Sequence, residues 1–208
     1  GIRVIQPTYN RHNRLGDGCM ELADEGLSHT GHEAVERMNA LGILVDASHC
    51  GRITAADAIR HSTRPVAFTH TGCAALADHP RNRTDAELRA VANKGGAAGI
   101  YVMPYLSGGR QPTADDVVRH IEHAVNVAGE EHVSIGTDGT LASVTAVLEP
   151  SLMALLAVVN RCRTTFGDFD AVVRDESAIQ SRSNGMLWTS DAPFVVHIES
   201  RNNEVGSP

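Results

Sequence analysis

Two apolar, strand-like runs of the sequence end in side chains that could bind a metal ion or move a proton. The run GILVDASHC (42–50) ends in Asp46 and His49, and the run PVAFTHTG (65–72) ends in His70. Neutral imidazoles bind zinc and similar metals, and carboxylates supply charge or accept protons, when a rigid element fixes both in space. A single histidine after a strand is usually an ordinary hydrogen-bonded loop residue. Two at matching positions on successive runs form the pattern that a metal site would give.

Other strand-like runs also end in polar side chains, namely Tyr9 and Asn10, Tyr105, and Asp138. In parallel α/β folds the ligand site lies beyond the carboxyl ends of the strands, so these groups are expected to share one mouth with the two histidines. Asp138, in IGTDG, could equally be a turn residue that precedes Gly139.

Arg81 and Asp85 lie in HPRNRTD (79–85), shortly after the second histidine. An arginine there could bind a carboxylate through two parallel hydrogen bonds, although a solvated cap or a salt bridge is the ordinary interpretation. His120 and His123 fall on the polar side of a helical pattern, so we expect them at the surface. The sequence contains no serine nucleophile elbow, phosphate-binding loop or dinucleotide-binding glycine turn.

The elements that must position these groups alternate along the chain. Thr30 and Glu33 have the spacing of a capping box, and Thr54 and Thr84 each stand at the start of a later helical pattern. The strand-like runs cover 2–8, 43–48, 65–70, 97–104 and 132–138, and the helical patterns cover 30–41, 54–62, 84–94 and 113–129.

Strands that are apolar on both faces and alternate with amphipathic helices are typical of parallel βαβ units. About five such units follow one another, whereas a closed barrel of this type needs eight strands and about 250 residues. The sequence therefore predicts an α/β fold, a partial TIM-type (β/α) barrel. We expect residues 1–141 to hold these units and the site motifs. Residues 142–208 would form a C-terminal segment with a helix at 149–165, a strand at 194–200 and a frayed tail.

Composition excludes several classes of protein. The 208 residues are 42% hydrophobic, which disfavours disorder, and the net charge of −7 with scattered lysine and arginine disfavours binding to nucleic acid or anionic lipid. No run is long enough to span a bilayer, and no signal peptide is recognisable. The four cysteines lack CxxC spacing, so reduced thiols and a cytoplasmic setting are expected. Because the chain begins with Gly1 rather than Met, we expect a removed segment or an internal fragment.

Five blocks in order resemble the membrane dipeptidase (renal dipeptidase) family of zinc metallopeptidases, in its bacterial form. The blocks are TYNRHNRLGDGC (8–19), GLSHTGHEAVERMNALGILVDASH (26–49), S-x-x-P-V-x-F-x-H (62–70), ADHPRNRTD (77–85) and HVSIGTDG (132–139). Each block alone is a weak signal, whereas the ordered set is specific. The resemblance covers roughly two thirds of the chain.

The resemblance implies that His49 and His70 ligate one zinc of a two-zinc centre and that Arg81 binds the carboxylate of a dipeptide substrate. It implies that Asp138 lies by the metals and binds the substrate amine or handles a proton. The implied reaction is hydrolysis of the peptide bond of a dipeptide by a metal-bound hydroxide. Tyr9 stands where some members carry a histidine that contacts the substrate.

Two elements of the family pattern are missing from this sequence. The family supplies a His-x-Asp pair from its first strand and a metal-bridging glutamate from a later one, both upstream of the first matching block, and no His-x-Asp occurs here. Two protein ligands are fewer than the three that catalytic zinc sites usually have. We therefore expect at most one zinc ion to be retained and the 208 residues alone to be inactive.

Two alternatives remain open at this stage. An amidohydrolase-like metal-dependent hydrolase would act on a lactone, a phosphoester or another amide. Such barrels commonly add a metal-bridging lysine, and Lys94, the sole lysine, lies poorly for that role in a helix-ending KGG. A non-catalytic scaffold on a decayed barrel would need no zinc. Side-chain and chirality preference cannot be read from the sequence, but exposed strand edges of an incomplete barrel favour a homo-oligomer.

Overall fold

The computed structural model describes residues 1–138, 169–171 and 195–200. Strands and helices alternate along the first of these ranges, as the sequence predicts. In chain order the elements are β1 Val4–Ile5, α1 His29–Ala40, β2 Leu44–Asp46, α2 Arg52–His61, β3 Val66–Cys73, β4 Asn82–Arg83, α3 Asp85–Asn93, β5 Ala98–Ile100, the 3-10 helix η1 Pro104–Leu106, α4 Ala114–Ala128, the 3-10 helix η2 Glu130–His132, β6 Val133–Gly136, β7 Phe169–Ala171 and β8 Val195–Ser200.

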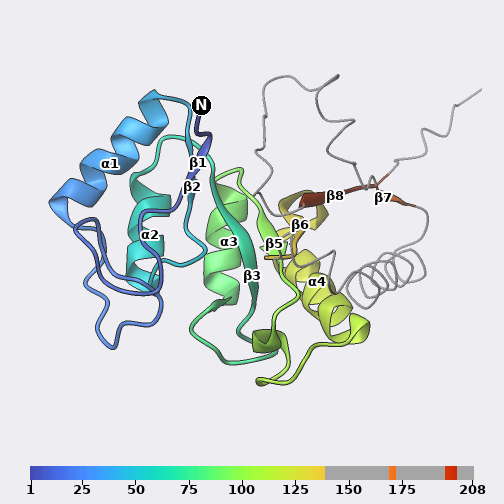
Figure 1. Ribbon diagram of the computed structural model, residues 1–208. Coiled ribbons are helices and arrows are strands. Elements are labelled where there is room, and N and C mark those ends of the chain that lie inside the picture. The colour runs from blue at the N-terminus through green and yellow to red at the C-terminus, as the bar shows by residue number, and fades with distance from the viewer. Residues whose placement is uncertain (139–168, 172–194, 201–208) are drawn as a thin grey trace, which may run out of the picture.

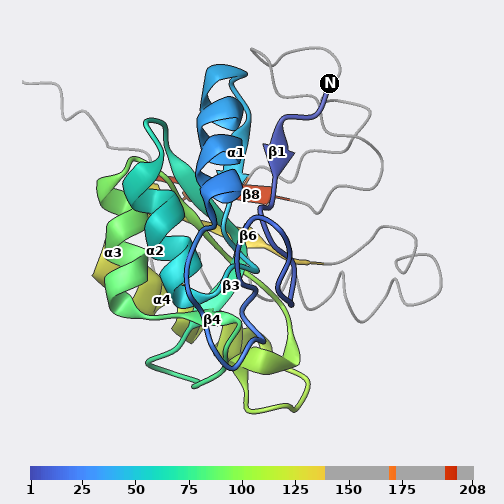
Figure 2. The same ribbon diagram turned by 90° about the vertical axis from the view of Figure 1, so that its left-hand side faces the viewer.

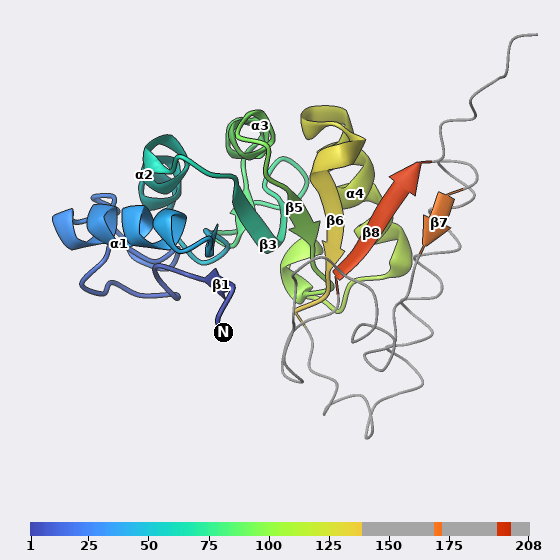
Figure 3. The same cartoon turned by 90° about the horizontal axis from the view of Figure 1, so that it is seen from above.

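The described strands form one sheet in the order β1-β2-β3-β5-β6-β8-β7, with β4 paired to β3 outside this path. The neighbours from β1 to β6 are parallel, whereas β8 is antiparallel to both β6 and β7. Helices α1 to α4 lie along one side of the curved row of strands (Figures 1 and 3). The predicted α/β class is confirmed, and the arrangement is consistent with a partial TIM-type barrel.

The core lies between the parallel strands and the helices that cover them. Strand residues such as Val45, Val66 and Ile100 are at most 1% exposed, and they pack in one cluster with helix residues such as Val35 and Ile121. Because these short strands are apolar on successive residues, they bury both faces, which is what parallel strands under helices require. Cys19, Cys50 and Cys73 are buried and free, as the missing CxxC spacing suggests.

The predicted starts of two helices are wrong, and both errors concern the capping residue. Ser28, not Thr30, caps α1, because its side-chain oxygen accepts from the Gly31 backbone N–H. Helix α2 begins at Arg52 after Gly51, which has no side chain to cap it. The predicted capping threonine of α2 therefore lies inside the helix. The predicted cap of α3 is correct, since Thr84 forms a capping box, and Thr113 forms another at the start of α4.

His120 is not a surface residue as its helical position suggests. It is 2% exposed, its Nδ1 accepts from the Cys73 backbone N–H at 2.9 Å, and its Nε2 lies 3.1 Å from the Leu106 carbonyl oxygen. At this position α4 faces backbone groups of β3 and η1 instead of water. His123 does lie nearer the surface, where it pairs with Asp85 at 2.7 Å.

Only some of the predictions for the C-terminal segment can be compared with the described structure. Strand β8 agrees with the strand expected at 194–200. The helix expected at 149–165 lies outside the described residues, and so does most of the segment expected to follow residue 141. No helix in the described part of the chain combines the length and the apolar character needed to cross a membrane.

Candidate metal and substrate site

The imidazoles of His49 and His70 lie side by side, with His49 three residues beyond the end of β2 and His70 inside β3, which continues past the predicted strand end to Cys73. Their ring centroids are 4.9 Å apart, and the planes are inclined by 57°. Both residues are buried, with exposed fractions of 6% and 5%. The pairing of β3 with β5 changes register between Phe68 and Thr71, the stretch that contains His70. Such irregularities turn a side chain away from the regular alternation of a strand.

Hydrogen bonds to Nδ1 fix the tautomer of both rings. Nδ1 of His49 lies 2.8 Å from the amide oxygen of Asn10, which can only accept, so Nδ1 donates. Thr69 Oγ1 donates its one hydrogen to Asp46 at 2.6 Å and therefore accepts from Nδ1 of His70 at 2.8 Å. Each ring consequently keeps its proton on Nδ1 and presents the lone pair of Nε2, the arrangement seen in metal-ligating histidines.

The two Nε2 atoms differ in their surroundings. Nε2 of His70 is buried and has no hydrogen-bond partner among the described residues. Nε2 of His49 lies 3.1 Å from Nη2 of Arg81. A buried nitrogen lone pair without a donor is costly unless something else binds it, so Nε2 of His70 fits a metal ion such as zinc, whereas Nε2 of His49 accepts from Arg81 and would have to exchange that donor for the metal. Within residues 1–138 no group of three or more histidine, cysteine or acidic side chains is arranged to hold a metal.

Asp46 supports the site but does not face it. It is 2% exposed, and its two carboxylate oxygens accept from Ser48 and from Thr69, through both backbone and side-chain groups. With four donors on two oxygens, this carboxylate ties the end of β2 to β3. The polar end of the run 42–50 therefore contains one residue that faces the candidate site, His49, and one that holds β2 and β3 together beneath it, Asp46.

The electrostatic surroundings keep both imidazoles neutral. Burial, together with the neighbouring Arg81 charge, lowers the pKa of His49 to about 3. Burial also lowers the pKa of His70, against the opposing effect of the Asp46 and Asp138 carboxylates. Neutral imidazole is the form that binds a metal ion, because protonation removes the lone pair.

Arg81 lies directly before β4 and is 3% exposed. Its Nη1 donates to the Ser48 carbonyl oxygen, and its guanidinium carbon lies 5.9 Å from the ring centroid of Tyr101. The sequence placed Asp85 in the same loop, but Asp85 begins α3 and pairs with His123 there. Of Arg81 and Asp85, only Arg81 reaches the site, where its Nη2 lies beside His49.

Tyr9 and Asp138 are exposed groups at the edge of the site. Tyr9 is 66% exposed and stacks on His49 with centroids 4.2 Å apart. Asp138 has a φ of 55°, in keeping with a turn, and its negative charge acts on both His70 and Arg81. Tyr105, the remaining strand-end residue, instead stacks on His79 with a centroid distance of 4.1 Å. The five predicted site residues therefore gather at one end of the sheet.

Sequence reasoning overlooked Thr69 and Arg83. Thr69 fixes the His70 ring, and Arg83 donates to three backbone carbonyls around His49. Their neighbours in the chain gave the available signal: Thr69 directly precedes His70, and Arg83 stands two residues after Arg81. Neither position identifies these roles, because the Thr69 hydroxyl hydrogen goes to Asp46, 23 positions away, and the Arg83 contacts join residues that are 33 to 36 positions apart.

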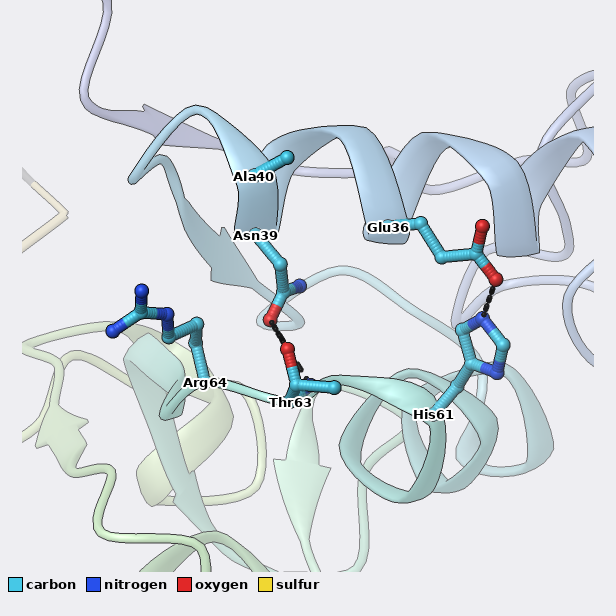
Figure 4. A pocket seen from close by; sticks show the side chains of 6 residues that line it. All are labelled: Glu36, Asn39, Ala40, His61, Thr63 and Arg64. Atoms are coloured by element: carbon cyan, nitrogen blue, oxygen red, sulfur yellow. Dashed lines mark hydrogen bonds and ion pairs between the residues drawn. The ribbon is translucent and has the colours of Figure 1, made fainter.

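A cavity of about 280 Å³ occurs elsewhere in the molecule, between α1 and the residues that follow α2. Figure 4 shows its lining, with Glu36 paired to His61 and the Asn39 amide bonded to Thr63. These residues precede β2 and β3, so the cavity lies at the opposite end of the strands from the two imidazoles. In barrels of this kind that end serves stability and the carboxyl end holds the chemistry.

Comparison with known proteins gives the following similarities. Residues 1–153 match the family described as membrane dipeptidase (peptidase family M19). The dipeptidase verJ of Clonostachys rogersoniana is 34% identical over 140 residues, which are 66% of this chain and 36% of that protein. The chain spans only 33% to 55% of the length of the curated relatives that it matches.

Two solved structures extend the comparison to the fold. An amidohydrolase from Pseudomonas aeruginosa is 41% identical, with a TM-score of 0.63 over 66% of this chain and 42% of the other. A metallo peptidase from Rhodobacter sphaeroides, solved with a phosphinate mimic of the dipeptide L-Ala-D-Ala, is 26% identical, with a TM-score of 0.69 over 81% of this chain and 51% of the other.

Proposed function

The chain belongs to the membrane dipeptidase family, peptidase family M19, and from that premise we propose that it carries metal-binding and substrate-binding groups of a zinc-dependent dipeptidase. The observation that carries the proposal is the pair of neutral imidazoles, each protonated at Nδ1 by the hydrogen-bond pattern, with centroids 4.9 Å apart. In this proposal His49 and His70 bind one zinc ion through Nε2. The unpartnered, buried Nε2 of His70 supports it.

Three further residues receive roles in the proposal. Arg81 binds the substrate carboxylate, for which its planar guanidinium is suited once it exchanges the Ser48 carbonyl for the substrate. Asp138 binds the substrate amine or accepts a proton, and its exposure leaves it accessible to a ligand. Tyr9 lines the entrance above His49 and contacts the bound dipeptide.

A zinc ion bound in such a site polarises a carbonyl oxygen and lowers the pKa of water. The residues of this chain do the remaining work. Asn10 and Thr69 hold the two imidazoles in the ligating tautomer, and Arg81 fixes one end of the substrate. Asp138 holds the substrate amine or takes up a proton at the other end.

The first experiment measures zinc binding by the 208-residue chain. We expect at most one zinc ion per chain, with loss of binding in both His49→Ala and His70→Ala. His61→Ala is the matched control, because His61 lies by the cavity at the opposite end of the strands. Retention of zinc in either site variant, or equal loss in His61→Ala, would contradict the proposed ligands.

The second experiment tests the substrate class with a phosphinate mimic of L-Ala-D-Ala, the ligand of the Rhodobacter sphaeroides structure. We expect calorimetry to show binding to the zinc-loaded chain and a weakening of about tenfold or more in Arg81→Met, because a charge-assisted bidentate contact is lost. An amidohydrolase of another substrate, the description of the Pseudomonas aeruginosa structure, would bind zinc but not this mimic.

Turnover by the 208 residues is a separate matter. Two imidazoles are fewer protein ligands than the three usual at catalytic zinc, so we propose that these residues alone hydrolyse no dipeptide at a substantial rate. The measurement is release of alanine from L-Ala-D-Ala with added zinc. Rapid hydrolysis that a chelator and His49→Ala both abolish would show that this part of the proposal is wrong.

A further inference from the structure

Arg83 is completely buried, although it lies only two residues from the arginine assigned to the substrate. Its exposed fraction is 0%, and its Nη1 pairs with Glu87 Oε1 at 2.9 Å. Its guanidinium carbon lies 4.7 Å from the ring centroid of Phe68. A buried arginine is rare and needs acceptors for its donors; Nη1 and Nη2 of Arg83 have them, whereas its Nε has no partner among the described residues.

Most of those acceptors belong to one turn. Nη2 of Arg83 lies 3.0 Å from the Ala47 carbonyl oxygen, 2.9 Å from that of Ser48 and 2.8 Å from that of Cys50. Nη2 carries two hydrogens, so at least one of them is shared between two oxygens. The three carbonyls lie on both sides of His49 in the chain.

The fourth carbonyl of the turn is bound from the other side. The His49 carbonyl oxygen accepts from the Cys19 backbone N–H at 2.8 Å. Cys19 belongs to the long connection between β1 and α1, drawn in dark blue in Figure 2, and the neighbouring Gly18 forms a bridge with Cys50 of the turn. Residues 47–50 are therefore held between this connection and Arg83, and every carbonyl of the turn has a donor.

Glu87 explains how the arginine charge is tolerated in the interior. Its Oε1 accepts from Arg83, while its Oε2 accepts from the backbone N–H and the hydroxyl of Thr84. Glu87 thus neutralises Arg83 and completes the capping box of α3 with the same carboxylate. The pair links the start of α3 to the turn that carries His49.

We propose that Arg83 is a positioning residue that holds the turn 47–50 so that the His49 imidazole faces His70. Its consequence for metal binding rests on the proposed function. A simple structural ion pair would need only Glu87, whereas the three carbonyl contacts are specific to the path of this turn. The guanidinium acts through the backbone and touches neither the substrate nor the metal.

The test compares Arg83→Met and Arg83→Lys with two controls by zinc or cobalt titration. We expect Arg83→Met to weaken metal binding by about 10- to 100-fold, the usual effect of losing a group that orients a ligand. The metal affinity of Arg83→Lys should lie between that of Arg83→Met and that of the native chain, because an ammonium keeps the charge but lacks the planar geometry of the guanidinium. If Arg83→Met does not fold, Arg83→Lys carries the test.

The controls separate positioning from general stability. Leu88→Ala removes a side chain that is 1% exposed from the next helix and should lower Tm without changing metal affinity. Arg89→Met removes a charge from the exposed face of the same helix and should change neither. An affinity loss in Leu88→Ala as large as in the Arg83 variants, at equal loss of Tm, would overturn the proposal.

A second readout needs no metal. In ¹⁵N-resolved NMR of the imidazoles, the native chain should show a His49 ring protonated at Nδ1 and shifted by its bond to Asn10. In Arg83→Met this signal should move or broaden, while the signal of His120 stays in place. If the native chain binds no metal, the proposed function fails but this comparison still decides the role of Arg83. An unchanged His49 signal would refute that role.

Discussion

At the scale of single residues, the groups around the imidazoles determine the chemistry as much as the imidazoles do. His70 has an unpartnered Nε2 because Thr69 binds its Nδ1, and Thr69 can accept that bond because Asp46 takes the hydroxyl hydrogen. The chain of hydrogen bonds from His70 through Thr69 to Asp46 therefore determines which nitrogen of the ring carries the lone pair. Carboxylate-supported orientation of this kind is common among metal-ligating histidines.

The first prediction concerns Thr69→Val, which removes the hydroxyl and keeps the shape of the side chain. Nδ1 of His70 and one oxygen of Asp46 then lose their partner. We expect zinc affinity to fall about 10- to 100-fold and the free energy of unfolding to fall by about 1–3 kcal/mol. Zinc titration and urea unfolding measure the two effects.

Thr63→Val is the matched control for this substitution. Thr63 also donates a hydroxyl hydrogen bond, to Asn39 at 3.0 Å, but at the opposite end of the strands. The Thr63→Val variant should have a lower free energy of unfolding than the native chain and the same zinc affinity. A zinc affinity that is unchanged in Thr69→Val would contradict the orienting role of the hydroxyl.

The sequence identified His49 and His70 but not the hydrogen bonds that orient their rings, and the reason is physical. A histidine after an apolar run is visible in the sequence because strand ends follow hydrophobic periodicity. The Asn10 contact to His49 joins residues that are 39 positions apart, and only the folded chain brings them together. His120 was misplaced for the same reason, since its partner Cys73 is 47 positions away.

At the scale of the elements, the helix caps show the limit of local patterns. Thr84 and Thr113 cap their helices through residues three positions later, so the sequence is sufficient. Helix α2 has no such residue, and its first N–H groups are bound by Asp24, nearly thirty residues upstream. A Cβ on Gly51 would lie 2.3 Å from an Asp24 carboxylate oxygen, which explains why glycine precedes this helix.

The second prediction concerns His120 and the docking of α4. His120→Leu leaves the Cys73 N–H and the Leu106 carbonyl without their partner. We expect the free energy of unfolding to fall by about 1–3 kcal/mol for each unsatisfied group. Chemical denaturation at pH values above the ordinary imidazole pKa measures the full difference. A loss no larger than that of a surface His→Leu substitution, such as His29→Leu, would contradict the role given to these contacts.

The same contacts predict a dependence on pH. Burial lowers the pKa of His120 below its ordinary value of 6.5, so protonation favours the unfolded chain. The stabilisation is complete above about pH 6.5 and is lost as the pH falls toward the folded-state pKa. The difference between the native chain and His120→Leu should therefore shrink as the pH falls from about 7.5 to 5. A constant difference would show that His120 does not titrate with unfolding.

Asp116, one turn before His120 on α4, has a lowered pKa and loses its stabilising effect only in stronger acid.

The third prediction concerns the curvature of the sheet. A Cβ on Gly136 of β6 would lie 1.9 Å from the Thr69 carbonyl oxygen of β3, and one on Gly99 of β5 would lie 2.2 Å from the same atom. Strands on either side of β5 thus approach closely, as a curved sheet requires. Gly136→Ala should reduce the free energy of unfolding by about 1–3 kcal/mol through overpacking. Ser134→Ala in the same strand is the control, and an equal effect of both would contradict this explanation.

At the scale of the whole molecule, the order of the described strands leaves β1 at one end of the sheet. Parallel pairing runs from β1 to β6, and within the described residues the free edge of β1 pairs with no other strand. The alternation of strands and helices could be predicted because it depends on local hydrophobic pattern. The closure of the sheet could not, because it depends on which edges meet.

The last prediction follows from that edge. Ile2 is 68% exposed beside β1, whose backbone N–H and C=O groups on the free side pair with no strand among the described residues. An apolar, unpaired edge is a template for association, and natural proteins block it with lysine. We therefore expect the 208-residue chain to self-associate with rising concentration in analytical ultracentrifugation and Ile2→Lys to shift the distribution toward the monomer. Leu41→Lys, at a residue that is 50% exposed at the end of α1, should leave the distribution unchanged. A native chain that stays monomeric at all concentrations, or a Leu41→Lys variant that dissociates as fully as Ile2→Lys, would show that the β1 edge does not drive association.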